Sequence, residues 1–354
     1  MKAINRPTLL INKNICQSNI SKMAEKAKRN NLIFRPHFKT HQSSEVGEWF
    51  RQEGIDLITV SSVGMARFFA GHGWKNITIA FPCNILEIDD IIELGSTIRL
   101  NLLIESVEVA GILFENIRNK TGIFLKIDSG YHRTGIEPEN LTLIRAIMDR
   151  ISNNSKLQFC GFLTHTGQTY HAQGVEEIKG IFQPVFRSLQ KLKSEFKSMY
   201  QDLIISVGDT PGCSLLDEFP GVDEIRPGNF VFYDLMQFHI GSCEMKDIAV
   251  AVICPVVAIH KSRQEAVIYG GAVHLSKEYC RSADNSIIYG MAVEWDGKHW
   301  NTDKTLGYLS SLSQEHGILK LNEGISLHPG QLVAIIPVHS CLAADLLKMD
   351  QQII

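Results

Sequence analysis

Residues 122–136 read GIFLKIDSGYHRTGI, in which a short apolar run is followed by a polar segment with two glycines. β-Branched and aromatic residues favour a buried strand, and Gly, Asp and Ser favour a turn at its end. The same combination recurs from about residue 33 to residue 234, with longer segments of helical spacing between the apolar runs. The candidate strands are residues 33–38, 57–62, 77–82, 98–104, 123–128, 157–164, 203–207 and about 230–233.

Eight alternating strand and helix patterns predict an α/β fold in which the strands close into a (β/α)8 TIM barrel. An open, doubly wound parallel sheet is the alternative that the same alternation allows. After about residue 245 the pattern changes to glycine-punctuated strands at 250–259, 265–268, 287–293 and 332–337. We therefore predict a barrel domain over 12–244 and a smaller β-rich domain over 245–354, which the N-terminal segment 1–11 is expected to join.

The composition narrows the class of protein. The 354 residues include 35 basic and 38 acidic side chains, with a formal net charge of −3 and no long basic stripe, which argues against a nucleic-acid partner. The longest apolar stretch, 248–259, is shorter than the ~20 residues that span a bilayer, and no secretory signal is recognisable. The eight cysteines lack the spacing of a zinc finger, so we expect reduced thiols and a cytoplasmic protein.

Polar segments adjoin five of the predicted strands. They are RPHFKTH (35–41), KIDSGYHRTGI (126–136), THTGQTYH (164–171), SVGDTPG (206–212) and EIRPGN (224–229). The active site of a (β/α)8 barrel lies at the carboxyl ends of its strands, so these segments are expected to meet at one rim. Their convergence favours an active site over five unrelated solvated loops.

Lys39 is the first candidate for chemistry at this rim. A lysine at a strand end, between His37 and His41, is expected to be partly desolvated, which frees its amine as a nucleophile toward carbonyl groups. A surface lysine in a βα loop is the alternative. The glycine turns at 208–212 and 227–229 fall where barrel enzymes commonly hold a phosphate. A nucleophilic lysine together with a phosphate site predicts a phosphorylated aldehyde cofactor.

His339 and Cys341 are separated by one residue in the segment IIPVHSCLAADLL. If that segment is a strand, both side chains point to the same face and can share one borderline-soft cation such as zinc. Most His-x-Cys pairs bind nothing, so the spacing alone is weak support. Two protein ligands would leave positions open for water or substrate, as in a catalytic site. The nearby segment 314–317, QEHG, is a candidate source of a further ligand or acid–base group.

Taken together, these motifs resemble the fold-type III pyridoxal-phosphate enzymes, in the branch of D-serine dehydratase and D-threonine aldolase. The resemblance covers nearly the whole chain and rests on PHFKTH, IDSGYHRTGI, HTGQTYH, GDTPG, EIRPGNFVFYD, QEHG and PVHSC in that order. Two departures are visible: Ser61 and Ser62 stand where a threonine is usual, and the turn GDTPG differs from the usual phosphate turn.

The resemblance implies roles for individual residues. Lys39 would bind pyridoxal 5′-phosphate covalently, and Arg133 would lie near its phenolic oxygen. Thr210, Gly228 and Asn229 would hold the phosphate, Tyr170 would lie near the ring, and Arg226 would meet the pyridine nitrogen. His37 and Gln168 would contact the substrate. His339 and Cys341 match the metal pair of the dehydratases, with Zn²⁺ as the expected ion and Mn²⁺ or Mg²⁺ as alternatives.

The resemblance also implies the reaction. A 3-hydroxy-D-amino acid would lose its β-hydroxyl by elimination, giving a 2-oxo acid and ammonia, as in D-serine dehydratase. Retro-aldol cleavage to glycine and an aldehyde is the alternative, but cysteine at position 341 accompanies dehydratases and zinc in this family, whereas aspartate accompanies aldolases. An amino-acid racemase would need a second base such as Tyr279 from a partner subunit, and a non-catalytic cofactor carrier would not need residues 245–354. A homodimer is expected.

Overall fold

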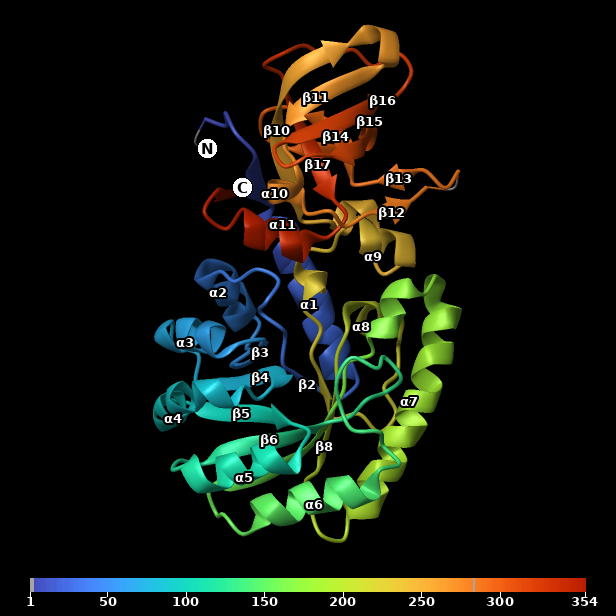
Figure 1. Cartoon of the computed structure of the whole chain (residues 1–354). Helices are drawn as coiled ribbons and strands as arrows, with labels where there is room; N and C mark the ends of the chain where they lie inside the picture. Colours follow the sequence, from blue (N-terminus) through green and yellow to red (C-terminus); the bar gives the residue numbers. More distant parts are fainter. Residues whose placement is uncertain (1–2, 283) are drawn as a thin grey trace. The chain divides into compact units, whose positions relative to one another are not determined.

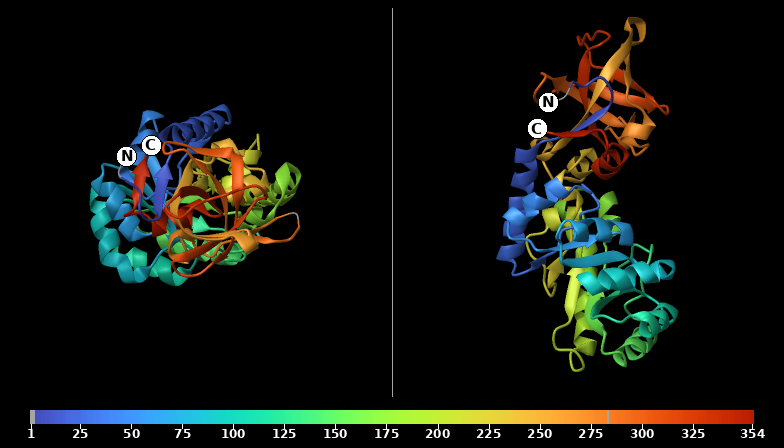
Figure 2. Two further views of the ribbon diagram at one scale, coloured as in Figure 1. Left: turned by 90° about the horizontal axis from the view of Figure 1, so that it is seen from above. Right: turned by 90° about the vertical axis from the view of Figure 1, so that its left-hand side faces the viewer.

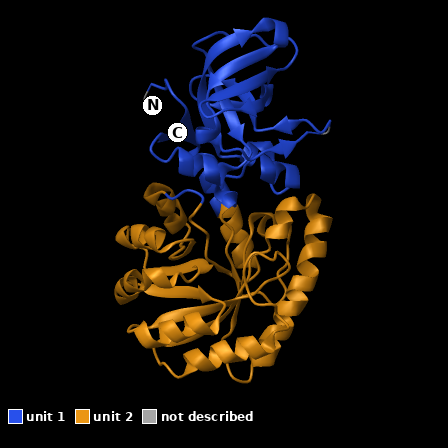
Figure 3. Ribbon diagram, in the orientation of Figure 1, with its two compact units in different colours: residues 1–20, 40–42, 229–354 blue, residues 21–39, 43–228 orange. Residues whose placement is uncertain are grey.

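The fold was analysed in a computed structural model that describes residues 3–282 and 284–354. The chain forms two compact units, coloured separately in Figure 3. One consists of residues 21–39 and 43–228, and is called the barrel unit below. The other consists of residues 1–20, 40–42 and 229–354, and is called the β-rich unit. The functional division at residue 244 that the sequence suggests stays a prediction.

Within its described residues, the barrel unit contains one sheet of eight parallel strands in the order β2-β9-β8-β7-β6-β5-β4-β3. The strands are β2 (Ile33–Phe34), β3 (Leu57–Val60), β4 (Asn76–Pro82), β5 (Arg99–Ile104), β6 (Thr121–Lys126), β7 (Leu157–Leu163), β8 (Ile204–Val207) and β9 (Glu224–Ile225). A parallel bridge between His37 and Thr59 joins the segment after β2 to β3 and closes the ring. The predicted (β/α)8 barrel is therefore confirmed.

Helices lie around the outside of this sheet, as Figure 1 shows for α2 to α7. They are α2 (Ser44–Gln52), α3 (Val63–Gly71), α4 (Ile88–Thr97), α5 (Val107–Asn116), α6 (Leu141–Ser152), α7 (Gly174–Phe196) and the short α8 (Thr210–Leu215), with 3-10 turns η1 (Ile85–Glu87) and η2 (Gly167–His171). Side-chain caps start several of them: Ser43, Ser62, Ser106 and Asp209 each accept a bond from a backbone N–H of the first turn. Ser62, one of the two serines at which the sequence departs from the family it resembles, thus begins α3.

The β-rich unit is built on a mixed sheet in the order β11-β16-β15-β14-β17-β10-β1-β18, with β11 also paired to β10. Its strands are β1 (Thr8–Ile11), β10 (Val250–His260), β11 (Glu265–Tyr269), β14 (Gly290–Trp295), β15 (Trp300–Leu312), β16 (His316–Leu321), β17 (Leu332–Pro337) and β18 (Gln351–Ile353). The predicted N-terminal strand pairs with β10, and both views of Figure 2 show the two terminal strands side by side.

The remaining elements are α1 (Lys13–Arg29), η3 (Asn229–Val231), α9 (Leu235–Ile240), η4 (Met245–Asp247), η5 (Lys261–Arg263), α10 (Ala272–Leu275), the hairpin β12 (Cys280–Arg281) with β13 (Ile287–Ile288), and α11 (Ser340–Leu346). One expectation about the strands was wrong, and two strands were missed. The eighth barrel strand is β9, not residues 230–233, which begin in the turn η3. Strands β15 and β16 were not predicted, because polar residues such as Asn301, Asp303 and Lys304 break up the first of them.

A buried polar network crosses the interior of the barrel next to β9. Arg35 Nε donates to Glu224 Oε2 at 2.7 Å, and Ser206 Oγ donates to Glu224 Oε1 at 2.6 Å. Arg226 Nε donates to Ser206 Oγ at 2.6 Å. The carboxylate of Glu224 therefore balances two buried guanidinium groups and joins the segment after β2 to β8 and β9.

Replacing Glu224 by glutamine should destabilise the barrel strongly. The variant keeps the shape of the side chain but leaves Arg35 and Arg226 without their buried counter-charge, which costs about 3–5 kcal/mol. Urea unfolding followed by circular dichroism measures the loss. Glu93→Gln, which removes half of an exposed pair with Arg67, is the matched control and should cost less than about 1 kcal/mol. Equal losses in the two variants would contradict this account.

Candidate active site

The carboxyl ends of the barrel strands carry most of the residues selected from the sequence. Lys39 lies in the turn that follows the His37 bridge, and its backbone N–H donates to His37 Nδ1 at 3.3 Å. The side chain of Lys39 is exposed, so the desolvation expected for it is not observed. The desolvated lysine is Lys126, at the end of β6, which is buried and donates to Ile127 O at 2.9 Å.

Positive charge is concentrated around His165, the second residue after β7. Desolvation of the imidazole lowers the pKa of His165 to about 3, and the charges of Lys39, Arg133 and Arg226 add to the shift. The ring is therefore neutral, with Nδ1 bonded to Gly208 O. Three of the predicted cofactor residues thus act electrostatically on one side chain, although they come from three different strand ends. Such a group of cations favours an anionic ligand.

Lys126 and Arg226 are two further buried cationic groups near these strand ends. Burial and the charge of Arg226 lower the pKa of Lys126 to about 7. Burial also lowers the pKa of Arg226 to about 10, although Glu224 counteracts the shift, so the guanidinium remains charged near neutral pH. Its second amino group donates to Thr164 O, which fixes its position next to the end of β7. Arg226 is consequently a rigid, charged donor group beneath the strand ends.

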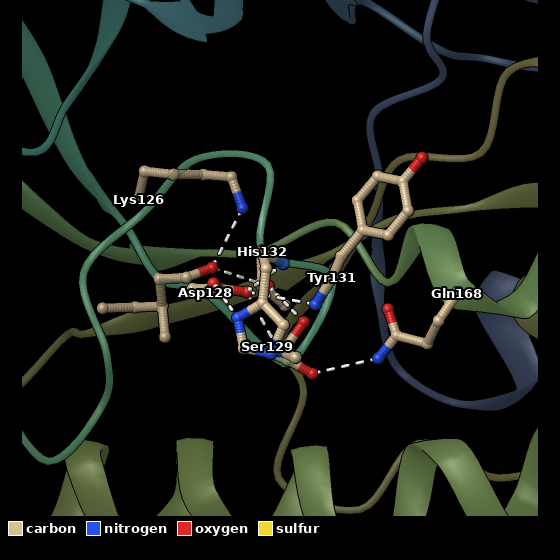
Figure 4. A network of polar contacts seen from close by, with 9 residues as sticks. Lys126, Asp128, Ser129, Tyr131, His132 and Gln168 are labelled. Carbon is tan, nitrogen blue, oxygen red and sulfur yellow. Dashed lines mark hydrogen bonds and ion pairs between the residues drawn. The ribbon is translucent and has the colours of Figure 1, made fainter.

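The turn after β6 is organised by Asp128, as Figure 4 shows. Asp128 Oδ1 accepts from the backbone N–H groups of Gly130, Tyr131 and His132 at 2.9–3.1 Å, and Oδ2 lies 2.9 Å from His132 Nδ1. Partial burial would raise the pKa of Asp128, but these backbone bonds hold it below its ordinary value. The rigid turn presents Arg133, whose guanidinium lies 5.1 Å from the centre of the Tyr131 ring.

The turn η2 carries Gln168 and Tyr170. Gln168 Nε2 donates to Ser129 O at 3.0 Å, the contact visible in Figure 4, and the Tyr170 ring lies 6.2 Å from the His165 ring. Among the described residues, Gln168 Oε1 and Thr166 Oγ1 are buried without a hydrogen-bond partner. Buried polar atoms of this kind usually bond to a ligand or water, so η2 retains unused bonding capacity.

Glycines keep the neighbouring turns close together. A Cβ atom on Gly208 would lie 2.9 Å from Arg226 Cβ, and one on Gly212 would lie 2.2 Å from the Phe182 ring. Thr210, the first residue of α8, is buried between them. Gly228 follows Pro227, whose carbonyl accepts from His37 N at 2.9 Å. The predicted phosphate turns therefore approach the barrel as closely as backbone allows.

The other predicted residues lie in the β-rich unit. His339 caps α11 and Cys341 lies in its first turn, so the two residues are not in a strand as predicted. They nevertheless form a hydrogen bond, because the chain turns at Ser340 to start the helix. Burial alone would lower the pKa of His339, but the bond with Cys341 and the charges of Asp234 and Glu278 raise it to about 9.

Two further groups contact the sulfur of Cys341. Thr40 Oγ1 lies 3.3 Å from Sγ, and Asn229 Nδ2 donates to it at 3.4 Å. Asn229 also donates to Asp234 Oδ2 at 2.7 Å and Ser340 Oγ at 2.9 Å, so its side chain belongs to this cluster. No group of three His, Cys, Asp or Glu side chains in the described ranges is arranged to hold a metal. The pair His339 and Cys341 is thus a two-residue candidate with soft donor atoms.

Sequence reasoning gave no role to Lys126, Asp128, His165, Asp209 or Thr40. A signal did exist, because the first four lie at or directly after the ends of β6, β7 and β8 inside the polar segments noted above. What the sequence could not supply is their burial, which depends on the barrel.

None of the helices in the described part of the chain is long and apolar enough to span a bilayer.

A (β/α)8 barrel that carries cationic side chains and glycine turns at its strand ends has the arrangement of a barrel enzyme. Residues 11–235 match the family described as alanine racemase, N-terminal domain, and residues 249–349 match the putative serine dehydratase domain. The chain belongs to this family of fold-type III pyridoxal-phosphate enzymes, in its serine dehydratase branch. The predicted family and the lyase class are confirmed.

Three relatives illustrate the match. A D-serine dehydratase of Dictyostelium discoideum is 31% identical over 99% of this chain and 95% of its own. The structure of D-threo-3-hydroxyaspartate dehydratase from Delftia sp. HT23 superposes with a TM-score of 0.88 at 24% identity, over 97% of this chain and 93% of its own. That of D-threonine aldolase from Filomicrobium marinum gives 0.82 at 20% identity, over 97% and 89%. A cysteine-to-alanine mutant of a D-threo-3-hydroxyaspartate dehydratase has also been solved in a metal-free form.

Alanine in place of Gly167 should disturb the site. Its Cβ would lie 2.3 Å from Cε1 of Tyr131, so the ring that packs under Arg133 must move, at a cost of about 1–3 kcal/mol. Gly180→Ala in α7 is the matched control, because nothing lies within 4 Å of its Cβ, and it should stabilise by about 0.5–1 kcal/mol. Thermal melts of both variants measure the two opposite shifts; a neutral Gly167→Ala would contradict the packing described.

Proposed function

We propose that this protein is a pyridoxal-phosphate-dependent lyase for 3-hydroxy-D-amino acids, and that it catalyses β-elimination to a 2-oxo acid and ammonia in the manner of a D-serine dehydratase. The observation that carries the proposal is the group of Lys39, Arg133 and Arg226 around the neutral His165 at the strand ends. The D-serine dehydratase from Dictyostelium discoideum, which aligns with nearly the whole chain, supports it.

The residues present fit this cofactor. Lys39 offers an exposed amine for the covalent link, and the cations favour the anionic ring oxygen and phosphate. Thr210, Gly228 and Asn229 would hold the phosphate, with Asn229 acting through its backbone because its amide bonds to Asp234. Bonds left unmade at Gln168 Oε1 and Thr166 Oγ1, both buried, remain for the ligand.

The chain's own groups then divide the work. Pyridoxal phosphate, when bound, supplies an electron sink at the α-carbon. Lys39, once released, would remove the α-proton as general base. Arg226 has only N–H donors, so it would hold the pyridine nitrogen as an acceptor, while Arg133 would face the phenolic oxygen. Tyr170 would pack near the ring, and His37 and Gln168 would orient the substrate.

We further propose that His339 and Cys341 hold a divalent metal, with Zn²⁺ as the preferred ion. Imidazole and thiolate are donors that suit zinc, and the contacts of Asn229 Nδ2 and Thr40 Oγ1 with the sulfur orient it. Asn229 Oδ1 is buried without a partner among the described residues, so polar capacity remains there. A bound ion would act as a Lewis acid toward the β-hydroxyl of the substrate. The Delftia structures carry mutations at a histidine and a cysteine two positions apart, and the cysteine mutant is metal-free.

Retro-aldol cleavage is the second candidate, favoured by the match to D-threonine aldolase. Cys341 argues for dehydration, because a thiolate selects a softer ion than the carboxylate that accompanies aldolases.

We also propose that the protein is cytoplasmic and forms a homodimer. The eight cysteines of the chain, all in its described part, are free thiols, which supports a reducing compartment. Apolar contact area for a second subunit is offered by the exposed side chains of Phe81, Leu86, Tyr279 and Met349. Sedimentation equilibrium measures the subunit number directly.

Lys39 should carry the cofactor. Protein purified with pyridoxal 5′-phosphate is expected to be yellow, and borohydride should bleach it while fixing the cofactor to the peptide that contains Lys39. Lys39→Ala should lose the colour and at least about 1,000-fold in kcat, because the base is gone. The exposed Lys197→Ala is the control and should behave like the wild type. A colourless protein that cannot be reconstituted would refute the central assignment.

The products should identify the reaction. D-serine, D-threonine and 3-hydroxy-D-aspartate are offered before and after treatment with a chelator. We expect 2-oxo acid and ammonia, with activity lost on chelation and restored by Zn²⁺. Cys341→Asp should shift metal preference toward Mn²⁺ or Mg²⁺ and raise the share of glycine and aldehyde. Glycine and aldehyde from the wild type would establish the aldolase instead, and turnover indifferent to chelation would remove the metal pair from the mechanism.

A further inference from the structure

Asp209, directly after β8, is a buried acid that the proposed mechanism does not use. It is 3% exposed, and its Oδ1 atom accepts from Gly212 N at 2.6 Å and from Thr169 Oγ1 at 3.0 Å. Its Oδ2 atom is buried and has no hydrogen-bond partner among the described residues. A cap on α8 accounts for the bond to Gly212, but Ser or Asn would serve that purpose equally well. The orphaned second oxygen needs another explanation.

A buried carboxylate with one unbonded oxygen is costly, so the neutral acid is the favoured form. Burial raises the pKa of Asp209 to about 7, although the bonds from Gly212 and Thr169 and the charge of Arg226 oppose the shift. The other titratable groups that face this position are Cys213 on α8, Lys26 of α1 beside it, and His165, which bonds to the preceding residue Gly208. The charge that acts on Asp209 itself is that of Arg226.

The hydrogen bond from Thr169 to Asp209 also fixes two proposed site residues, because Thr169 lies between Gln168 and Tyr170 in η2. Gln168 is held from the other side by Ser129 O, at the start of the Asp128 turn. The turn η2 is therefore pinned at two points, by Ser129 in the loop after β6 and by Asp209 in the loop after β8. Loss of the second bond would release η2 and the GDTPG loop from each other.

We propose that Asp209 is a positioning residue, which ties the loop after β8 to η2 through Thr169 and so aligns the phosphate turn with Gln168 and Tyr170. The inference rests on the cofactor part of the proposed function, but not on the metal or the reaction type. Asp209 directly precedes Thr210, which is proposed to hold the phosphate, so an ionised Asp209 would repel the phosphate dianion. Cofactor binding therefore selects the protonated carboxyl.

The first test compares the wild type with Asp209→Asn, which keeps the shape and one acceptor but does not titrate. The dissociation constant of pyridoxal 5′-phosphate is measured by absorbance from pH 6 to pH 8.5. The ratio of wild type to variant should rise about tenfold or more over this range, because only the neutral acid accepts the phosphate. Pyridoxal, which lacks the phosphate, should show no such rise, and Asp217→Asn, an exposed acid of the same loop region, should follow the wild type. Parallel pH profiles for wild type and Asp209→Asn would overturn the proposal.

The second test addresses the bond to Thr169. Asp209→Ala and Thr169→Val should each weaken cofactor binding and lower kcat, while Asp209→Asn rescues most of both. The double variant Asp209→Ala/Thr169→Val should be no worse than Asp209→Ala alone, because both changes remove one bond. Additive effects would show that the two residues act separately and would refute the link.

A third measurement separates this inference from the proposed function. Without cofactor, the raised pKa of Asp209 means that the folded wild type loses stability as pH rises from about 4 to about 7, and the loss stays constant above 7. Asp209→Asn is exempt, so the difference in thermal midpoint between the two should grow over that window and then level off. If no variant binds the cofactor but this difference appears, the proposed function fails and the buried neutral acid stands. A difference independent of pH would refute the neutral acid whatever the cofactor does.

Discussion

The carboxylate of Glu224 is the interaction on which the barrel unit depends. It is the shared counter-charge of Arg35 and, through Ser206, of Arg226, and all four side chains are buried where the first, seventh and eighth strands meet. Two arginines cannot be buried side by side without such a group, because the desolvation of an unpaired charge exceeds what packing returns. β2 and β9 are only two residues long, so few backbone hydrogen bonds join them to the sheet. The side-chain hydrogen bonds of Glu224 add to these few backbone bonds.

That constraint also places the site. Arg226 is held by Ser206 and Thr164, so its charge lies at a fixed position near the ends of β7 and β8, where it acts on His165 and Asp209. The imidazole is kept neutral and the carboxyl is kept near its titration point by the same burial. Burial at the barrel rim therefore sets the protonation of both groups, while the charge of Arg226 adds to the shift at His165 and opposes it at Asp209.

The sequence predicted six of the barrel strands because each is a run of four or more mostly apolar residues, and it predicted the two-residue β2 because Ile33 and Phe34 directly precede a polar segment. It failed at β9, since Glu224–Ile225 is short and begins with a charge, whereas the apolar residues 230–233 are buried without being a strand. For the site, the positions of the glycine turns and of Lys39 at strand ends followed from residue type and spacing, and their roles stay predictions; the exposure of Lys39 and the burial of Lys126 and Asp209 did not follow. The burial of these side chains depends on neighbours far along the chain.

The closeness of His339 and Cys341 was predicted for the wrong reason, because the start of α11, and not a strand, brings them together.

The charges of the two units sort the ligands that each can hold. In the barrel unit the charges of Lys39, Arg133 and Arg226 act on His165, and such an environment attracts phosphate and repels a divalent cation. In the β-rich unit Cys341 and Asp234 raise the pKa of His339, so the local field there is negative and favours a cation. Neither cluster suits the other's ligand. The proposed anionic cofactor and the proposed metal ion would therefore not compete, because the local fields at the two clusters have opposite signs.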